Sequence, residues 1–127
     1  MQLDALDHVA VIVTDLPRAT RFYEEVLGLR RIHEDAWGEW PVALVAGTSE
    51  AGVALFPAGA EGVPEETDPN IHFAFRVSRS GYEQAKLELS GLGIPFEEWD
   101  HDVAWAIYFR DPDGHQIEIA TYESANV

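Results

Sequence analysis

Cysteine is absent from the 127-residue chain. Disulfide bonds and thiolate chemistry are therefore excluded, and any metal must be bound by His, Asp or Glu. Basic residues are scarce as well, since 8 Lys and Arg stand against 23 Asp and Glu and the formal net charge is -15. Such a charge repels phosphate backbones and anionic lipids, so we expect neither nucleic acid nor a membrane as a partner.

Long hydrophobic runs are also missing. No apolar stretch approaches the roughly 20 residues of a membrane span, and the N-terminus lacks a basic flank followed by an apolar core. We therefore expect a cytoplasmic protein. The hydrophobic content of 46% fits a single domain over residues 1–127, with prolines and glycines scattered between the apolar segments.

What the chain does contain is one pattern that occurs twice. His8 lies in the segment DHVAVIVT and His72 lies 64 residues later in IHFAFRVS. In both places alternating apolar residues predict a strand, which is followed by a helix and three further strands. The pattern predicts an α+β fold made of two βαβββ repeats, repeat one at about 4–57 and repeat two at about 70–122.

The boundaries of the expected elements follow from turn and capping residues. The expected strands are 6–13, 29–34, 40–46 and 52–57 in the first repeat, and 71–77, 95–99, 103–109 and 115–122 in the second. The first helix begins at Thr14 to Pro17 and ends at Gly28. The second runs from about Gly81 to Leu92, capped by Ser78 or Ser80.

Glu118 is a candidate functional residue that the repeat does not duplicate. It alternates with two isoleucines, so its side chain faces away from the helix, and His8 and His72 face the same way in their own strands. A carboxylate in this position needs a partner, and a metal would supply one. Across the repeat Glu118 falls on the apolar Ala54, so the two halves are not equivalent.

Two imidazoles and one carboxylate on one side of a metal form a facial triad that leaves about three coordination positions open. This donor set suits Fe(II) or Mn(II) best, and zinc, nickel and cobalt also fit it. We therefore predict a divalent metal bound by His8, His72 and Glu118.

Several segments together resemble the vicinal oxygen chelate superfamily, which includes glyoxalase I, bleomycin resistance proteins and extradiol dioxygenases. They are the two histidine strands, Asp15-Leu16, Phe22-Tyr23, Leu27-Gly28-Leu29, and Asp111-Pro112-Asp113-Gly114 leading to Glu118. The resemblance implies a homodimer and paired βαβββ units, whose eight mostly antiparallel strands form a curled sheet around a metal-binding cup. It also implies the same three metal ligands, and it places Ala54 where glyoxalase I has a fourth ligand, which argues against that activity.

The second half is similar to the extradiol dioxygenase signature, in which a histidine and a tyrosine precede the acidic-Pro-x-Gly turn and the ligand glutamate. The matching residues here are His101 and Tyr108, followed by Asp111 to Gly114 and Glu118. The resemblance makes His101 and Tyr108 candidate catalytic residues that orient a substrate hydroxyl. These enzymes also place an acid-base histidine upstream of the second ligand. This chain departs from that pattern, because residues 34–71 contain no histidine, and His33 is the candidate substitute.

Three functions remain open from the sequence. The leading one is a metal-dependent, dioxygenase-like oxidoreductase whose small-molecule substrate binds through two neighbouring oxygens. Trp105 and Phe109 share parity and fit either the core or an interface, or alternatively an aromatic cup wall, which an aromatic substrate would suit. The alternatives are a metal-free, drug-binding protein of the bleomycin-resistance kind, which the negative charge favours, and a metal-dependent lyase or epimerase.

Overall fold

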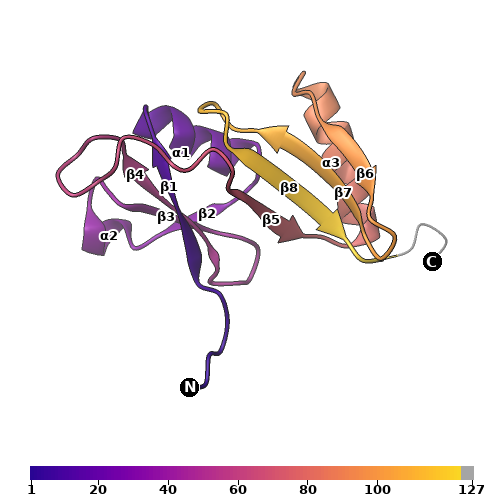
Figure 1. Cartoon of the computed structure of the whole chain (residues 1–127), viewed down its shortest axis with the longest axis horizontal. Helices are drawn as coiled ribbons and strands as arrows, with labels where there is room; N and C mark the ends of the chain where they lie inside the picture. Colours follow the sequence, from indigo (N-terminus) through magenta and orange to yellow (C-terminus); the bar gives the residue numbers. More distant parts are fainter. Residues whose placement is uncertain (124–127) are drawn as a thin grey trace. The chain divides into compact units, whose positions relative to one another are not determined.

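A computed structural model of the chain describes residues 1–123. The chain divides into two compact units, 1–68 and 69–127. Each unit has its own four-stranded sheet and its own long helix (Figure 1). No helix within residues 1–123 is both long enough and apolar enough to cross a membrane.

The first unit has the order βαβαββ. Its elements are β1 (His8–Val13), α1 (Leu16–Glu25), β2 (Arg30–Ile32), α2 (Glu34–Trp37), β3 (Val42–Val45) and β4 (Gly52–Pro57). The sheet order is β1-β4-β3-β2, in which β1 and β4 are parallel and the other pairs are antiparallel. Helix α1 begins as expected, because the Asp15 carboxylate accepts a hydrogen bond of 3.1 Å from the Arg18 backbone N–H.

The second unit repeats this arrangement without the short helix. It contains β5 (His72–Arg76), α3 (Arg79–Gly91), β6 (Glu97–Asp100), β7 (Trp105–Arg110) and β8 (Gln116–Thr121), with the sheet order β5-β8-β7-β6. Ser78, one of the two predicted capping residues, accepts a hydrogen bond of 3.1 Å from the Gly81 N–H. The predicted α+β class and the two βαβββ repeats are confirmed.

The strand register confirms how the two halves correspond. His8 pairs with Gly52 across the parallel β1–β4 ladder, and His72 pairs with Gln116 across the β5–β8 ladder. Both members of the second pair lie 64 residues after those of the first. Glu118 and Ala54 are therefore equivalent positions, as the sequence predicted.

Each sheet has one face covered by its long helix and one face without it. Val53 and Leu55 of β4 are buried, as are Ile117 and Ile119 of β8, and α1 and α3 pack on these strands. Because side chains alternate along a strand, Ala54 and Glu118 lie on the opposite face of their sheets.

The alternation of β7 corrects one expectation. Trp105 and Phe109 share the parity of Ile107, which is fully buried, and Phe109 is only 4% exposed. These two aromatic residues therefore lie on the face covered by the helix. They do not form the predicted aromatic wall of the open face.

The connection between β2 and β3 is the main departure from the expected elements. The sequence predicted only a turn between the expected strands 29–34 and 40–46, whereas the structure has a short helix, α2, which ends before Gly38. The corresponding connection in the second unit, between β6 and β7, is only residues 101–104 and contains no helix. The first unit therefore carries additional structure at this point.

Candidate functional site

A polar cluster lies on the open face of the second sheet. Glu118 is on β8, flanked by β5, which carries His72, and by β7, where Tyr108 is directly opposite in the register. The Nε2 atom of His72 is 3.2 Å from Oε1 of Glu118. The Glu118 side chain is mostly buried, at 15% exposure, whereas the His72 side chain is half exposed. The sheet itself thus brings the two predicted ligands of this unit together.

Tyr108 extends the cluster towards the β6–β7 connection. Its hydroxyl is 2.9 Å from Nε2 of His101, and its ring lies edge-on to the His72 ring at 6.1 Å between centroids. Burial, the charge of Glu118 and a hydrogen bond to Glu118 together raise the pKa of the Tyr108 phenol. Tyr108 therefore stays protonated at neutral pH and can donate its proton in a hydrogen bond.

His101 reaches this cluster from an exposed turn. Its backbone N–H donates to the Ala104 carbonyl at 2.8 Å, and the neighbouring Asp102 has a left-handed φ of 70°. This tight turn directs the side chain of the exposed His101 towards Tyr108. The structure thus brings together His72, His101, Tyr108 and Glu118, four of the five residues predicted for the site.

The pair formed by His72 and Glu118 fits two neighbouring positions on one metal ion. Metal bonds of about 2.1 Å to nitrogen and oxygen, at right angles, place the two donor atoms about 3.0 Å apart. The observed separation of 3.2 Å is close to this value. Within residues 1–123 no three His, Asp or Glu side chains form a group that would hold a metal by themselves.

His8, the remaining predicted ligand, belongs to the first unit. Its Nδ1 atom hydrogen-bonds to Oδ2 of Asp7 at 2.8 Å. A carboxylate on one imidazole nitrogen fixes the tautomer and makes the other nitrogen a better metal donor. The contact with Asp7 leaves Nε2 of His8 as the ring nitrogen without this hydrogen bond.

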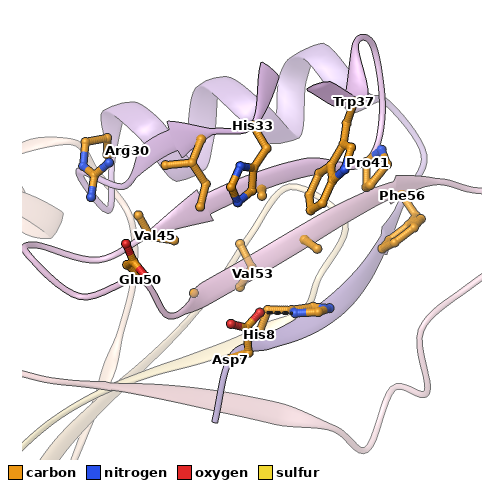
Figure 2. A pocket seen from close by; sticks show the side chains of 14 residues that line it. Asp7, His8, Arg30, His33, Trp37, Pro41, Val45, Glu50, Val53 and Phe56 are labelled. Carbon is orange, nitrogen blue, oxygen red and sulfur yellow. Dashed lines mark hydrogen bonds and ion pairs between the residues drawn. The ribbon is translucent and has the colours of Figure 1, made fainter. Parts of the chain in front are cut away.

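His8 also lines a cavity of about 260 Å³ on the open face of the first sheet (Figure 2). Small residues of the sheet, Gly52, Ala54 and Ala43, are among those that line it. Aromatic side chains border one end, where Trp37 and Phe56 lie near Pro41, and Arg30 and Glu50 lie towards the other end. The fourteen lining residues are Asp7, His8, Arg30, Ile32, His33, Trp37, Pro41, Ala43, Val45, Glu50, Gly52, Val53, Ala54 and Phe56.

The turn before β8 supports the position of Glu118. Asp111 is buried, and its carboxylate accepts hydrogen bonds from the backbone N–H groups of Asp113 at 3.0 Å and His115 at 2.8 Å. The His115 ring also contacts it, with 2.7 Å from Nδ1 to Oδ2. The Asp-Pro-Asp-Gly segment is therefore a rigid structural turn at the start of the strand that carries Glu118.

The sequence prediction missed Trp37 and the wall that α2 adds to the cavity. The available signal was length, since the segment between the second and third strands of repeat one is longer than its counterpart in repeat two. The prediction treated those extra residues as turn.

Two βαβββ-type units, each with one sheet face left open by its helix, are the architecture of the superfamily that the sequence resembles. Comparison with known proteins agrees. The family described as the Glyoxalase/Bleomycin resistance protein/Dioxygenase superfamily matches residues 5–119. The chain belongs to this superfamily.

Individual relatives differ in what they do. Glutathione transferase FosA of Serratia marcescens is 27% identical over 118 residues, which cover 92% of this chain and 80% of FosA. Biphenyl-2,3-diol 1,2-dioxygenase 3 of Rhodococcus globerulus is 33% identical over 121 residues, which cover 90% of this chain and 61% of the dioxygenase. A solved integron cassette protein from the mobile metagenome of the Halifax Harbour sewage outfall is 30% identical, with a TM-score of 0.74 and coverage of 94% of this chain and 99% of that chain.

Proposed function

We propose that this chain is a metal-dependent enzyme of the extradiol-dioxygenase type, in which His8, His72 and Glu118 bind one divalent ion. The observation that carries the proposal is the 3.2 Å approach of His72 to Glu118, with the hydrogen-bonded pair of Tyr108 and His101 beside it. A structural role alone would not require a histidine, a carboxylate and a phenol together on the open face of a sheet.

The donor set defines the cofactor. Two neutral histidines and a carboxylate suit Fe(II) or Mn(II), and zinc, nickel and cobalt also fit. When bound, such an ion offers open positions for two neighbouring substrate oxygens and stabilises negative charge that develops on them. The mostly buried Glu118 supplies the one negative charge among the three ligands.

Tyr108 and His101 have the role of positioning a substrate hydroxyl and its proton. The Tyr108 oxygen can accept a hydrogen bond from Nε2 of His101 while its proton is donated to an acceptor on the other side. Because its pKa is raised, the phenol stays a hydrogen-bond donor at the pH at which a substrate hydroxyl would bind. In the other tautomer of His101, Nε2 is unprotonated and accepts the Tyr108 proton, while the Tyr108 oxygen takes the proton of the substrate hydroxyl.

The comparisons support oxygen chemistry on an aromatic diol as the leading reaction. The dioxygenase from Rhodococcus globerulus is the 33% identical relative, but this chain spans only 61% of its length. That relative therefore supports the class of reaction. That this chain acts on the same substrate as the relative remains a proposal. A homodimer and a cytoplasmic location also remain predictions, as does the folding of both repeats as one domain.

Oxygen consumption tests the reaction directly. Protein loaded anaerobically with Fe(II) or Mn(II) is mixed with catechol or biphenyl-2,3-diol in oxygenated buffer, and oxygen uptake is compared with the appearance of a yellow ring-cleavage product. We expect uptake with the wild type and its loss in Glu118→Gln. Glu24→Gln, a change to an exposed carboxylate on α1, is the control and should retain activity. A wild type that binds no metal and consumes no oxygen with either diol would refute the dioxygenase assignment.

Thiol transfer is the second candidate, because glutathione transferase FosA matches 92% of this chain. A transferase would consume glutathione under anaerobic conditions, whereas a dioxygenase would stop without oxygen. A lyase or epimerase would also turn over its substrate without oxygen, but would leave glutathione unchanged. A metal-free drug-binding protein would bind a cationic antibiotic equally well after His8→Ala.

A further inference from the structure

We propose that the cavity of the first unit is the binding site for the aromatic ring of the substrate, with Trp37 and Phe56 contacting the ring and His33 hydrogen-bonding to one of its polar substituents. This inference deepens the proposed function and rests on it for the identity of the substrate. The evidence for the ring site itself comes from the first unit alone.

The floor of the cavity is open because the first repeat has alanines where the second repeat has the larger side chains of Glu118 and Tyr108. Ala54 pairs with Ala43 on the neighbouring antiparallel strand, whereas its repeat equivalent, Glu118, pairs with Tyr108. Two methyl groups thus replace a carboxylate and a phenol at matching places in the two sheets. The first unit therefore lacks the polar cluster of the second unit, and in its place has a cavity of about 260 Å³.

The wall of the cavity is the structure that only the first repeat has. Helix α2 places Trp37 along the cavity, and Trp37 remains 47% exposed. The Arg31 guanidinium holds the helix in place by donating to the Gly38 carbonyl at 3.0 Å and pairing with Glu34 at 3.4 Å. An exposed tryptophan held rigidly beside a concave surface is typical of a binding site, since an indole offers a large flat area at a small entropy cost.

His33 is held in an unusual conformation next to this tryptophan. Its φ and ψ of 62° and 18° are in the left-handed region, which is uncommon for a residue with a Cβ and is held in place by the surrounding structure. Its ring packs on Trp37 with 4.8 Å between centroids and points into the cavity (Figure 2). The imidazole makes no capping hydrogen bond to α2. It therefore offers a polar group to a ligand that contacts Trp37.

The shape and polarity of the cavity select the ligand class. Its volume is slightly below the roughly 300–1,000 Å³ of most ligand pockets, which suits one or two rings better than a peptide. The aromatic end is formed by Trp37, Pro41 and Phe56, and Arg30 and Glu50 lie away from it (Figure 2). A flat apolar ring with a hydroxyl substituent matches this end, with the hydroxyl directed to His33.

Calorimetric titration of four variants tests the proposal without relying on turnover. Zinc-loaded protein, which has no redox chemistry, is titrated with biphenyl-2,3-diol and with cyclohexane-1,2-diol, and metal content is measured separately. We expect Trp37→Ala to weaken binding of biphenyl-2,3-diol about tenfold, the loss expected for a ring contact with its buried area, and to leave the weaker cyclohexanediol binding unchanged. His33→Asn, which tolerates the left-handed backbone, should weaken the same diol without altering the fold.

Trp99→Ala is the matched control, because Trp99 is a tryptophan of similar exposure, 55%, on β6 of the second unit. It should leave binding within twofold of the wild type. Ala54→Leu provides a second variant that fills the cavity, in case Trp37→Ala fails to fold as judged by circular dichroism, and it should also weaken ring binding.

The outcomes separate this inference from the proposed function. Equal losses in Trp37→Ala and Trp99→Ala, or no loss in folded Trp37→Ala and Ala54→Leu, would overturn the ring site while leaving metal binding intact. Absence of metal from the wild type would overturn the proposed function. Ring binding that still depended on Trp37 in that metal-free protein would support the site by itself.

Discussion

Glu98 links the helix and the sheet of the second unit, and its replacement gives a stability change that depends on pH. The hydroxyl of the fully buried Tyr82 donates to Oε2 of Glu98 at 2.6 Å, and the Lys86 ammonium donates to the same oxygen at 3.0 Å. The hydrogen bond from Tyr82 is the main cause that lowers the pKa of the Glu98 carboxyl. Glu98→Gln keeps an acceptor for the tyrosine and removes the charge.

The size of the effect follows from the charge of the acceptor. A hydrogen bond to a charged group contributes about 1.5–3 kcal/mol and a neutral one about 0.5–1.5 kcal/mol. The Glu98 side chain is 34% exposed, so solvent screens the difference, and we expect a loss of about 1 kcal/mol at pH 7. Because the pKa of Glu98 is lower in the folded state, this contribution is present above the unfolded pKa and is lost as the pH falls through the folded one.

Urea denaturation at pH 7 and at pH 3 measures this difference. Glu98→Gln should unfold at lower urea than the wild type at pH 7, and the difference between the two proteins should be smaller at pH 3, where a larger share of the Glu98 carboxyl is protonated. Glu97→Gln is the control on the same strand, because Glu97 accepts a longer, 3.4 Å contact from the Trp99 indole. A destabilisation of Glu98→Gln that is the same at both pH values would refute the reasoning.

Three further changes test the structure and the site. Gly52→Ala should destabilise the first unit by about 1–3 kcal/mol in urea denaturation, because its new Cβ would collide with the Leu44 carbonyl oxygen, and wild-type stability would contradict this close approach. Asp111→Ala should cost about 1–3 kcal/mol in thermal unfolding, because it leaves two backbone N–H groups and the His115 ring without their buried acceptor, and an unchanged melting temperature would contradict that role. Tyr108→Phe should lower turnover of the metal-loaded enzyme by about tenfold or more with its metal content unchanged, and equal turnover would show that the phenol takes no part in the reaction.

The repeated fold was predictable because its signals are local. Alternating apolar residues in His8–Val13 and His72–Arg76, and capping side chains at Asp15 and Ser78, determine strands and helix starts over a few residues. The spacing of the two histidines was enough to predict that Glu118 is equivalent to Ala54. The strand pairing confirms this equivalence.

Much of the polar cluster was also predictable, whereas the cavity was not. His72 and Glu118 face the same way by strand parity alone, and family resemblance added His101 and Tyr108. The cavity depends on α2, whose residues have no periodic apolar pattern, and on a left-handed backbone at His33 that no local signal reveals. For Trp105 the sequence left a core position and an aromatic cup wall open, and its shared parity with the buried Ile107 places it on the face covered by the helix.

Metal content of the wild type and of three single variants tests the central claim most directly. Protein reconstituted anaerobically with Fe(II) or Mn(II), then freed of excess ion, is analysed by mass spectrometry of the metal. We predict one ion per chain in the wild type, and a loss of affinity of at least about 100-fold in each of His8→Ala, His72→Ala and Glu118→Gln, since each removes a direct ligand. His115→Asn, on the same strand connection as Glu118 but turned to Asp111, should retain the ion. A wild type without stoichiometric metal, or a His8→Ala variant that binds metal as tightly as the wild type, would contradict the account.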